Sequence, residues 1–332
     1  MATIRLTHID GKLPNLALMK LAHWHRTQGD TVHLSRTPSP SLLEPKYDMA
    51  YASAIFRSSL PVVNRFQAAF PDGLVGGTGT LTLDTVEDAV IGQEWENYDY
   101  SIYPDFRYSI GFTQRGCRLK CGFCVVPRKE GKPKAVNSIW DIWREGQPRA
   151  VHLLDNDFFG QPREDWRARV DELIQGRFRV SFSQGINIRM ITEETASAIA
   201  SVRYRDASLQ RKRIYTAWDN LGDEQRFFKG LDLLLQAGVK PDEVMVYMLV
   251  GYNPKETMKD VFYRFEQLVN AGCRPFPMVY ERENKPELRR FARWVIRRFY
   301  KHSTYEEFRA FTTRRQPGPE QQALPMEHLH GR

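Results

Sequence analysis

The chain has 332 residues, a length typical of about two domains. Hydrophobic residues make up 42% of it and charged residues 27%, the balance of a globular protein with a full-sized core. No run approaches about 18 apolar residues, which excludes a membrane span. Four cysteines are too few for a disulfide scaffold, and no secretory leader opens the chain, so we expect a cytoplasmic protein.

The net charge of +8 is unevenly distributed along the chain. Residues 1–105 hold eight basic and twelve acidic side chains, so this part is slightly acidic. Residues 115–134 and residues 285–301 each hold seven basic side chains and one acidic side chain. The positive charge therefore lies in two short segments and does not indicate a general nucleic-acid-binding surface.

The first hundred residues alternate short apolar runs with helical patterns, which is typical of a parallel sheet covered by helices. A Gly-rich run at 76–79 follows the last of these strands, and we interpret it as a turn because it lacks the G-x-G-x-x-G spacing. The predicted strands are 3–9, 31–34, 48–53 and 74–75, and the predicted helices are 13–28 and 61–70.

From about residue 106 the alternation continues at a longer and steadier period, over six β/α units. This pattern predicts a partial or whole β/α barrel, in which functional residues follow the C-terminal ends of the strands. Beyond Thr312 the chain becomes polar and rich in proline, and we expect a partly disordered tail. The predicted strands are 108–113, 150–154, 178–182, 213–218, 243–250 and 275–280, and the predicted helices are 166–174, 193–202, 224–237, 258–271 and 286–302.

Three of the four cysteines, Cys117, Cys121 and Cys124, follow the first strand of this region with the spacing C-x3-C-x2-C. Thiolates select soft metals, and three of them on a tight loop can hold three corners of an iron–sulfur cube. Such a cube leaves one iron open to a substrate or cofactor. The alternative is a structural zinc site with Cys273 as fourth ligand, which we disfavour because zinc ribbons usually show two C-x2-C pairs.

This segment resembles the radical S-adenosylmethionine (radical SAM) superfamily. The resemblance lies in the C-x3-C-x-aromatic-C motif after a strand and in Thr-Gln-Arg-Gly-Cys at 113–117, which is similar to the Thr-Ser-Arg-Gly-Cys of members with an N-terminal cobalamin-binding-type domain. It implies a [4Fe-4S] cluster on Cys117, Cys121 and Cys124 that cleaves SAM reductively to methionine and a 5′-deoxyadenosyl radical.

The resemblance also implies three parts of the chain. Residues 1–105 are expected to form a Rossmann-like domain of the cobalamin-binding type, residues 106–302 a partial (β/α)6 radical SAM barrel, and residues 303–332 a C-terminal extension. The expected cobalt-ligand loop, Asp-x-His-x-x-Gly, is absent, because residues 8–12 read His-Ile-Asp-Gly-Lys. We therefore interpret the first domain as degenerate, with cobalamin as a cofactor that the sequence does not support.

The resemblance to the radical SAM superfamily assigns SAM-binding roles to residues near the cysteines, according to their positions relative to the motif. The resemblance places Phe123 near the adenine of SAM. It places Asp155, Asn156 and Asp157 where many relatives carry Gly-Gly-Glu, which binds the SAM amino group. A carboxylate or an amide at this position can accept hydrogen bonds from an ammonium group. The alternative, equally weighted, is that Asp155 or Asp157 caps the following segment.

Further candidates follow the later strands, at the ends where barrel chemistry occurs. Those after the third strand can contact a substrate or the SAM carboxylate, although Arg189 has Glu193 four residues on as an alternative partner. The resemblance places the candidate of the fourth strand near the ribose and that of the fifth near the adenine. These candidates are Gln184, Asn187, Arg189, Thr216 and Gly251.

Two interpretations of the basic segment 115–134 remain open. It favours an anionic substrate, such as a nucleotide, an RNA or a phosphopantetheine carrier, or an acidic electron donor of the flavodoxin or ferredoxin type. The basic helix at 285–301 is more simply interpreted as a solvated outer face. We therefore expect a radical SAM enzyme acting on an unidentified substrate, nucleotide- or RNA-like. The alternatives are a cobalamin-dependent radical SAM methyltransferase and, in another class, a non-catalytic metal-binding nucleic-acid module.

Overall fold

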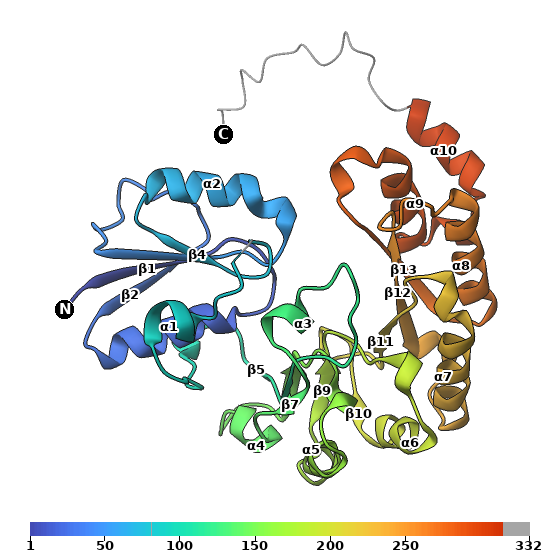
Figure 1. The fold of residues 1–332 in the computed structure, drawn as a ribbon, viewed down its shortest axis with the longest axis horizontal. Coiled ribbons are helices and arrows are strands. Elements are labelled where there is room, and N and C mark those ends of the chain that lie inside the picture. The colour runs from blue at the N-terminus through green and yellow to red at the C-terminus, as the bar shows by residue number, and fades with distance from the viewer. Residues whose placement is uncertain (81, 315–332) are drawn as a thin grey trace, which may run out of the picture. The chain divides into compact units, whose positions relative to one another are not determined.

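The computed structural model describes residues 1–80 and 82–314, and it is an α/β protein with several parallel sheets (Figure 1). The chain divides into two compact units. The first unit comprises residues 1–187 and 191–214, and the second comprises residues 188–190 and the described residues from Tyr215 onward. Within the described part, no helix is long and apolar enough to cross a membrane.

The first unit begins with a parallel sheet in the order β2-β1-β3-β4, which confirms the predicted Rossmann-like arrangement. Helices α1 and α2 cover opposite faces of this sheet (Figure 1). The elements are β1 (Thr3–His8), α1 (Leu16–Thr27), β2 (Thr31–Ser35), β3 (Met49–Ser53), α2 (Leu60–Ala69) and β4 (Leu74–Gly76).

The two faces of this sheet have separate cores because side chains alternate along a strand. Leu6 on β1 and Tyr51 on β3 are buried with Met19 of α1. Ala52 on β3 is buried on the other face with Phe66 of α2. The same alternation that predicted the strands thus decides which helix each strand residue contacts.

The glycine run after β4 is a turn, as predicted. Gly77 has a φ of 104°, a value that favours glycine. A Cβ atom at Gly77 would stand 2.2 Å from the carbonyl oxygen of Ala54, so the run lies directly against the backbone that follows β3. Gly79 donates its N–H to the same Ala54 oxygen at 2.9 Å.

A second parallel sheet of the first unit has the order β10-β9-β8-β5. Its strands alternate with helices as predicted, although β10 and a short antiparallel pair, β6 and β7, were not predicted. The elements are β5 (Ser109–Gly111), β6 (Gln114–Arg115), α3 (Val126–Lys129), β7 (Lys134–Ala135), α4 (Ile139–Ile142), β8 (Ala150–Leu153), α5 (Arg163–Gln175), β9 (Arg179–Phe182), α6 (Glu193–Ser201) and β10 (Arg203–Tyr204).

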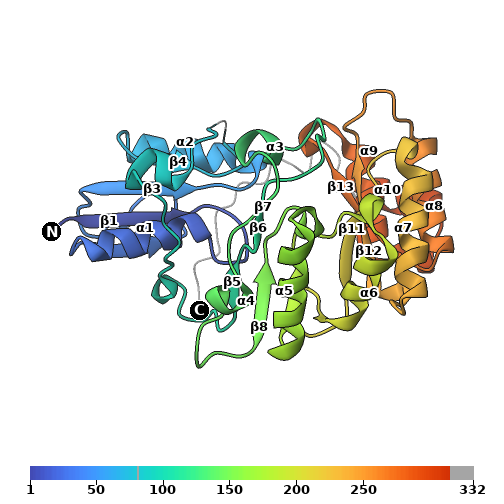
Figure 2. The same ribbon diagram turned by 60° about the horizontal axis from the view of Figure 1, so that its bottom comes forward.

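The second unit contains a three-stranded sheet in the order β11-β12-β13, and α7 and α8 lie beside it (Figure 2). Strands β12 and β13 are parallel. The elements are β11 (Ile214–Ala217), α7 (Glu224–Gln236), β12 (Val244–Val250), α8 (Met258–Asn270), β13 (Arg274–Val279), α9 (Pro286–Ile296) and α10 (Tyr305–Arg314).

Two expectations about the second half differ from the structure, and a third lies almost wholly outside the described residues. The predicted helix 286–302 ends at Ile296, because Arg298 adopts a left-handed φ of 60° and a short 3-10 turn, Phe299–Lys301, follows. The tail expected beyond Thr312 lies almost wholly outside the described residues. The described start of the C-terminal extension, from residue 303 onward, forms the helix α10. The six expected barrel strands belong to two separate sheets, with no ladder joining them among the described residues.

A buried arginine joins the strand ends of the second unit. Arg264, on α8, is fully buried and donates to the carbonyl oxygens of Trp218 at 2.8 Å and Leu249 at 3.0 Å. Its charge is balanced by Glu256, which also accepts the N–H of Gly251 at 2.9 Å. The chain leaving β11 and the end of β12 therefore depend on one ion pair.

Replacement of Arg264 by methionine should strongly destabilise the chain. The Arg264→Met variant would leave the Glu256 carboxylate without its cation and two carbonyl groups without the Arg264 donor, so we expect the free energy of unfolding to fall by about 3 kcal/mol or more. Urea denaturation followed by circular dichroism measures the change. As a control, Arg163→Met removes an exposed arginine and should change it by less than about 0.5 kcal/mol. Similar losses in both variants would contradict the role of Arg264.

A candidate cofactor site at the cysteine loop

The three clustered cysteines lie on one hairpin loop of the first unit, residues 116–133, which we call the cysteine loop. Strands β6 and β7 pair at its base, with Arg115 opposite Lys134. Gly116 has a φ of 82°, and a Cβ atom there would stand 2.3 Å from the carbonyl oxygen of Lys132. Glycine is therefore required where the outgoing and returning chains of the loop meet.

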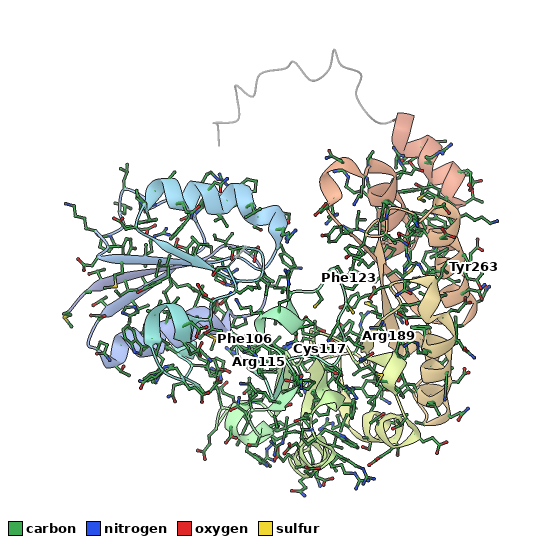
Figure 3. The ribbon with its side chains drawn as sticks, in the orientation of Figure 1. Phe106, Arg115, Cys117, Phe123, Arg189 and Tyr263 are labelled. Atoms are coloured by element: carbon green, nitrogen blue, oxygen red, sulfur yellow. The ribbon has the colours of Figure 1, made fainter. Side chains whose placement is uncertain are left out.

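The three cysteines form no disulfide bond and are partly exposed. The pKa of Cys117 is raised to about 11, chiefly by burial and also by the neighbouring Asp157, Cys124 and Cys121, whereas a hydrogen bond from the N–H of Leu119 at 3.4 Å opposes the shift. The three sulfur atoms are thus near enough to influence one another electrostatically. Arg115, Cys117 and Phe123 of this region are labelled in Figure 3.

Asp155, just after β8, ties this strand to the start of the cysteine loop. It accepts the backbone N–H of Thr113 at 2.7 Å and of Gln114 at 3.1 Å, and the Thr113 hydroxyl donates to its second oxygen. Burial raises the pKa of Asp155 to about 7, although these hydrogen bonds act in the opposite direction. The hydrogen bonds that the structure describes for this carboxyl group are thus all with Thr113 and Gln114, directly before the cysteine loop.

Asp157 holds the next part of the loop through Arg118. The guanidinium group of Arg118 donates to both carboxylate oxygens, at 2.7 and 2.9 Å, and its backbone N–H donates at 3.2 Å. The Asp157 side chain is 1% exposed, so this two-pronged ion pair is largely removed from water. Its own N–H donates to the side-chain oxygen of Gln114 at 3.0 Å.

Glu130 joins the two ends of the cysteine loop. Arg115 donates to both of its carboxylate oxygens at 3.0 Å, and the N–H of Gly116 donates to one of them at 3.0 Å. Asn156, between the two aspartates, donates to the same carboxylate at 2.8 Å. We did not predict a role for Glu130, and the available signal was that it is the one acidic residue in the basic segment 115–134.

These ion pairs change the electrostatic interpretation of the cysteine loop. Arg115 and Arg118 are paired with Glu130 and Asp157, so two of the seven basic side chains of segment 115–134 are already neutralised. Lys129 donates to the carbonyl oxygen of Asp84 at 3.1 Å, and burial lowers its pKa. The charge of segment 115–134 in the sequence therefore overstates the attraction that the folded loop exerts on an anion.

The other candidates of the first unit lie at separate places. Phe123 is 38% exposed beside Cys124. Gln184 is exposed in the turn after β9. Asn187 is partly buried, and its amide nitrogen has no hydrogen-bond partner among the residues that the structure describes.

Three predicted site residues belong to the second unit and are described there. Arg189 donates to Asp223 at 2.7 Å, a partner that we did not predict. Thr216 is buried on β11. Gly251 has a φ of 76° directly after β12, so the left-handed conformation gives a reason for glycine at this position.

The iron–sulfur expectation and the zinc alternative require different arrangements of ligands. Among residues 1–80 and 82–314, no three His, Cys, Asp or Glu side chains converge as the ligands of one ion would. Each thiolate of an iron–sulfur cube binds a different iron, so the sulfur atoms stand further apart than the ligands of one zinc ion. Cys273, the fourth ligand of the zinc alternative, is 5% exposed in the second unit, and burial raises its pKa to about 12.

Comparisons of the chain with protein-family models, curated proteins and solved structures find no match. The functional conclusion therefore depends on the cysteine motif and on the contacts that hold its loop.

Loss of the Asp157 charge should make Cys117 more reactive. In the Asp157→Asn variant, Arg118 loses its charged partner and a negative charge near the thiol disappears, so the pKa of Cys117 should fall. We expect alkylation by iodoacetamide at pH 8 to be about tenfold faster, as one pKa unit implies. Mass spectrometry of the metal-free protein resolves the rate at each cysteine. The control is Asp171→Asn, on the exposed side of α5, and equal rates in the two variants would contradict the expectation.

Asp155 should make stability depend on pH. Its folded pKa of about 7 lies above the value of about 3.9 in an unfolded chain, so the folded state keeps this proton longer. The resulting stabilisation is present below about pH 4 and is lost as the pH rises to about 7. Urea denaturation of the wild type and of Asp155→Asn at several pH values between about 4 and 7 measures this stabilisation. As the pH rises, the wild type should lose stability relative to the variant. Parallel pH profiles would contradict the raised pKa.

Proposed function

We propose that this chain is a radical SAM enzyme in which Cys117, Cys121 and Cys124 hold a [4Fe-4S] cluster. The observation that carries the proposal is a set of three cysteines, in the spacing C-x3-C-x2-C, on one hairpin loop that follows a parallel strand and is anchored to the segment after the next parallel strand. When bound, a cluster with one open iron would supply the position that chelates SAM and the electron that cleaves its sulfonium bond.

The residues around the loop support this proposal through pre-organisation. A site built to bind a cofactor is most effective when other residues hold its ligands in place beforehand. Asp155 fixes Thr113 and Gln114 before the first cysteine, and Asp157 fixes Arg118 directly after it. Cys117 is therefore held on both sides by other residues of the chain.

The segment after β8 receives a revised role within the proposal. Asp155 and Asp157 act as positioning residues, because their oxygens are engaged by the cysteine loop. Asn156 is only partly buried, and its amide nitrogen donates a hydrogen bond to Glu130. Its amide oxygen has no donor among the described residues, which makes it the candidate acceptor for the ammonium group of SAM.

The same proposal includes the expected (β/α)6 barrel. Strands β5, β8, β9, β11, β12 and β13 alternate along the chain with helices α4 to α9, which is the order that such a barrel requires. Gln184, Asn187, Arg189, Thr216 and Gly251 then remain candidates at the strand ends. A small acidic reductant of the flavodoxin or ferredoxin type is the expected electron donor.

The N-terminal sheet supplies no observation that favours the methyltransferase alternative. His8, at the end of β1, is fully buried and interacts with the Tyr103 hydroxyl at 2.9 Å. Burial lowers its pKa to about 4. These are the properties of a core histidine, so the proposal does not include a role for cobalamin.

The proposal is tested by anaerobic reconstitution with iron and sulfide, followed by dithionite and SAM. We expect a brown, cluster-loaded protein that forms 5′-deoxyadenosine. Cys121→Ala should lose the cluster and lower 5′-deoxyadenosine formation by at least about a hundredfold, because it removes one of three ligands. Cys273→Ala, the matched control, should retain both properties.

Two results would contradict the proposal. One is a cluster-loaded wild type that forms no 5′-deoxyadenosine. The other is a protein whose fold is restored by zinc alone, with equal metal loss in Cys121→Ala and Cys273→Ala, which would indicate a four-cysteine structural site.

A further inference from the structure

The helix α9 and the turn after it carry five exposed cationic side chains, which we call the basic face: Arg289, Arg293, Arg297, Arg298 and Lys301. None of the five side chains makes an ion pair or a hydrogen bond with a residue that the structure describes. The other two cations of segment 285–301 are used inside the second unit. Lys285 donates to two carbonyl oxygens at 2.7 Å, and Arg290 pairs with Glu287 at 2.6 Å.

The apolar side of α9 is already occupied. Phe291, Ala292, Trp294 and Val295 are buried, and the ring of Phe291 packs at 5.1 Å from that of Phe262 on α8. The helix therefore has no free apolar face to insert into a lipid surface, which membrane-binding amphipathic helices require. Its exposed side presents charge.

Five like charges within thirteen residues repel one another, so the basic face does not stabilise the fold by itself. Its charge becomes favourable when a negatively charged partner lies against it. In segment 115–134 part of the positive charge is already paired, because Arg115 and Arg118 have carboxylate partners. The unpaired cationic charge of segment 285–301 is therefore available to a partner outside the chain.

The spacing of the arginines fits a chain of phosphates. Arg289, Arg293 and Arg297 recur every four residues, or about 6 Å along a helix, so each can reach a different phosphate of one strand. Four of the five cations are arginine, whose planar group binds phosphate through two parallel hydrogen bonds. Phe299 lies between Arg298 and Lys301, and its ring stacks on that of Phe308 with the centroids 5.0 Å apart. Its side chain is still 39% exposed, so the part that Phe308 does not cover is available to an unpaired base.

We infer that the basic face is a docking surface for a single strand of nucleic acid. The inference goes beyond the proposed chemistry and is independent of it, because binding needs neither the iron–sulfur cluster nor SAM. It also replaces the interpretation of this helix as a merely solvated outer face.

The test uses the full chain and a fluorescent single-stranded RNA of mixed sequence, with a DNA of the same sequence as a second arm. Fluorescence anisotropy measures affinity between about 50 and 200 mM KCl. The variant is Arg289→Gln/Arg293→Gln/Arg297→Gln. The matched control is Arg163→Gln/Arg167→Gln, which removes exposed arginines that are paired with Glu194.

We expect the wild type and the control to bind alike and the triple variant to bind at least about tenfold more weakly at the lower salt concentration. The slope of log affinity against log salt should also fall by about 2, because each lost phosphate contact on a single strand contributes about 0.7. Equal loss of affinity for RNA and DNA would show that the shared phosphates are recognised, and loss for RNA alone that the sugar contributes.

Three results would overturn the inference. The first is an RNA affinity that is unchanged in the triple variant, and the second is a wild type that binds neither strand at low salt. The third is binding to vesicles containing phosphatidylserine that depends on the three arginines while binding to RNA does not. Circular dichroism confirms that each variant is folded, so a loss of binding is assigned to the removed charges.

Discussion

The position of the cysteine loop depends on an ion pair between the buried Asp157 carboxylate and Arg118. The Asp157 carboxylate lies almost wholly out of water, where an unpaired charge would cost several kcal/mol, and its partner Arg118 is the residue directly after Cys117. Asp155 adds hydrogen bonds to the residues before that cysteine. The position of the first thiol is consequently set by a strand that comes later in the chain.

The same pairing decides where the protein presents free positive charge. Glu130 closes the cysteine loop by binding Arg115, and this removes charge from the segment that carries the cysteines. On α9 the apolar side is packed, and Arg289 and Arg293 have no such partner among the described residues. The two segments have the same charge in the sequence, yet they differ in how much of it can act on another molecule.

In each unit, an arginine side chain forms hydrogen bonds with residues at the C-terminal ends of strands. In the first unit Arg118 binds the carboxylate after β8, and in the second Arg264 binds the carbonyl oxygens of Trp218 and Leu249. An arginine suits this position because its planar group donates in several directions at once. The loops that follow the strands are therefore held by specific polar contacts.

The sequence by itself determined the regular elements and the cysteine motif, because periodicity and spacing are local properties. It missed the strands β6, β7 and β10 and the helices α3 and α4, which are too short to show a period. It also missed α10 and the end of α9, where a non-glycine residue turns left-handed. Only the tertiary structure decided the role of Asp155 and Asp157, because their partners lie 42 and 39 residues away along the chain. A strand end shows that a polar residue is well placed, but the choice of its partner depends on which distant segment the fold brings against it.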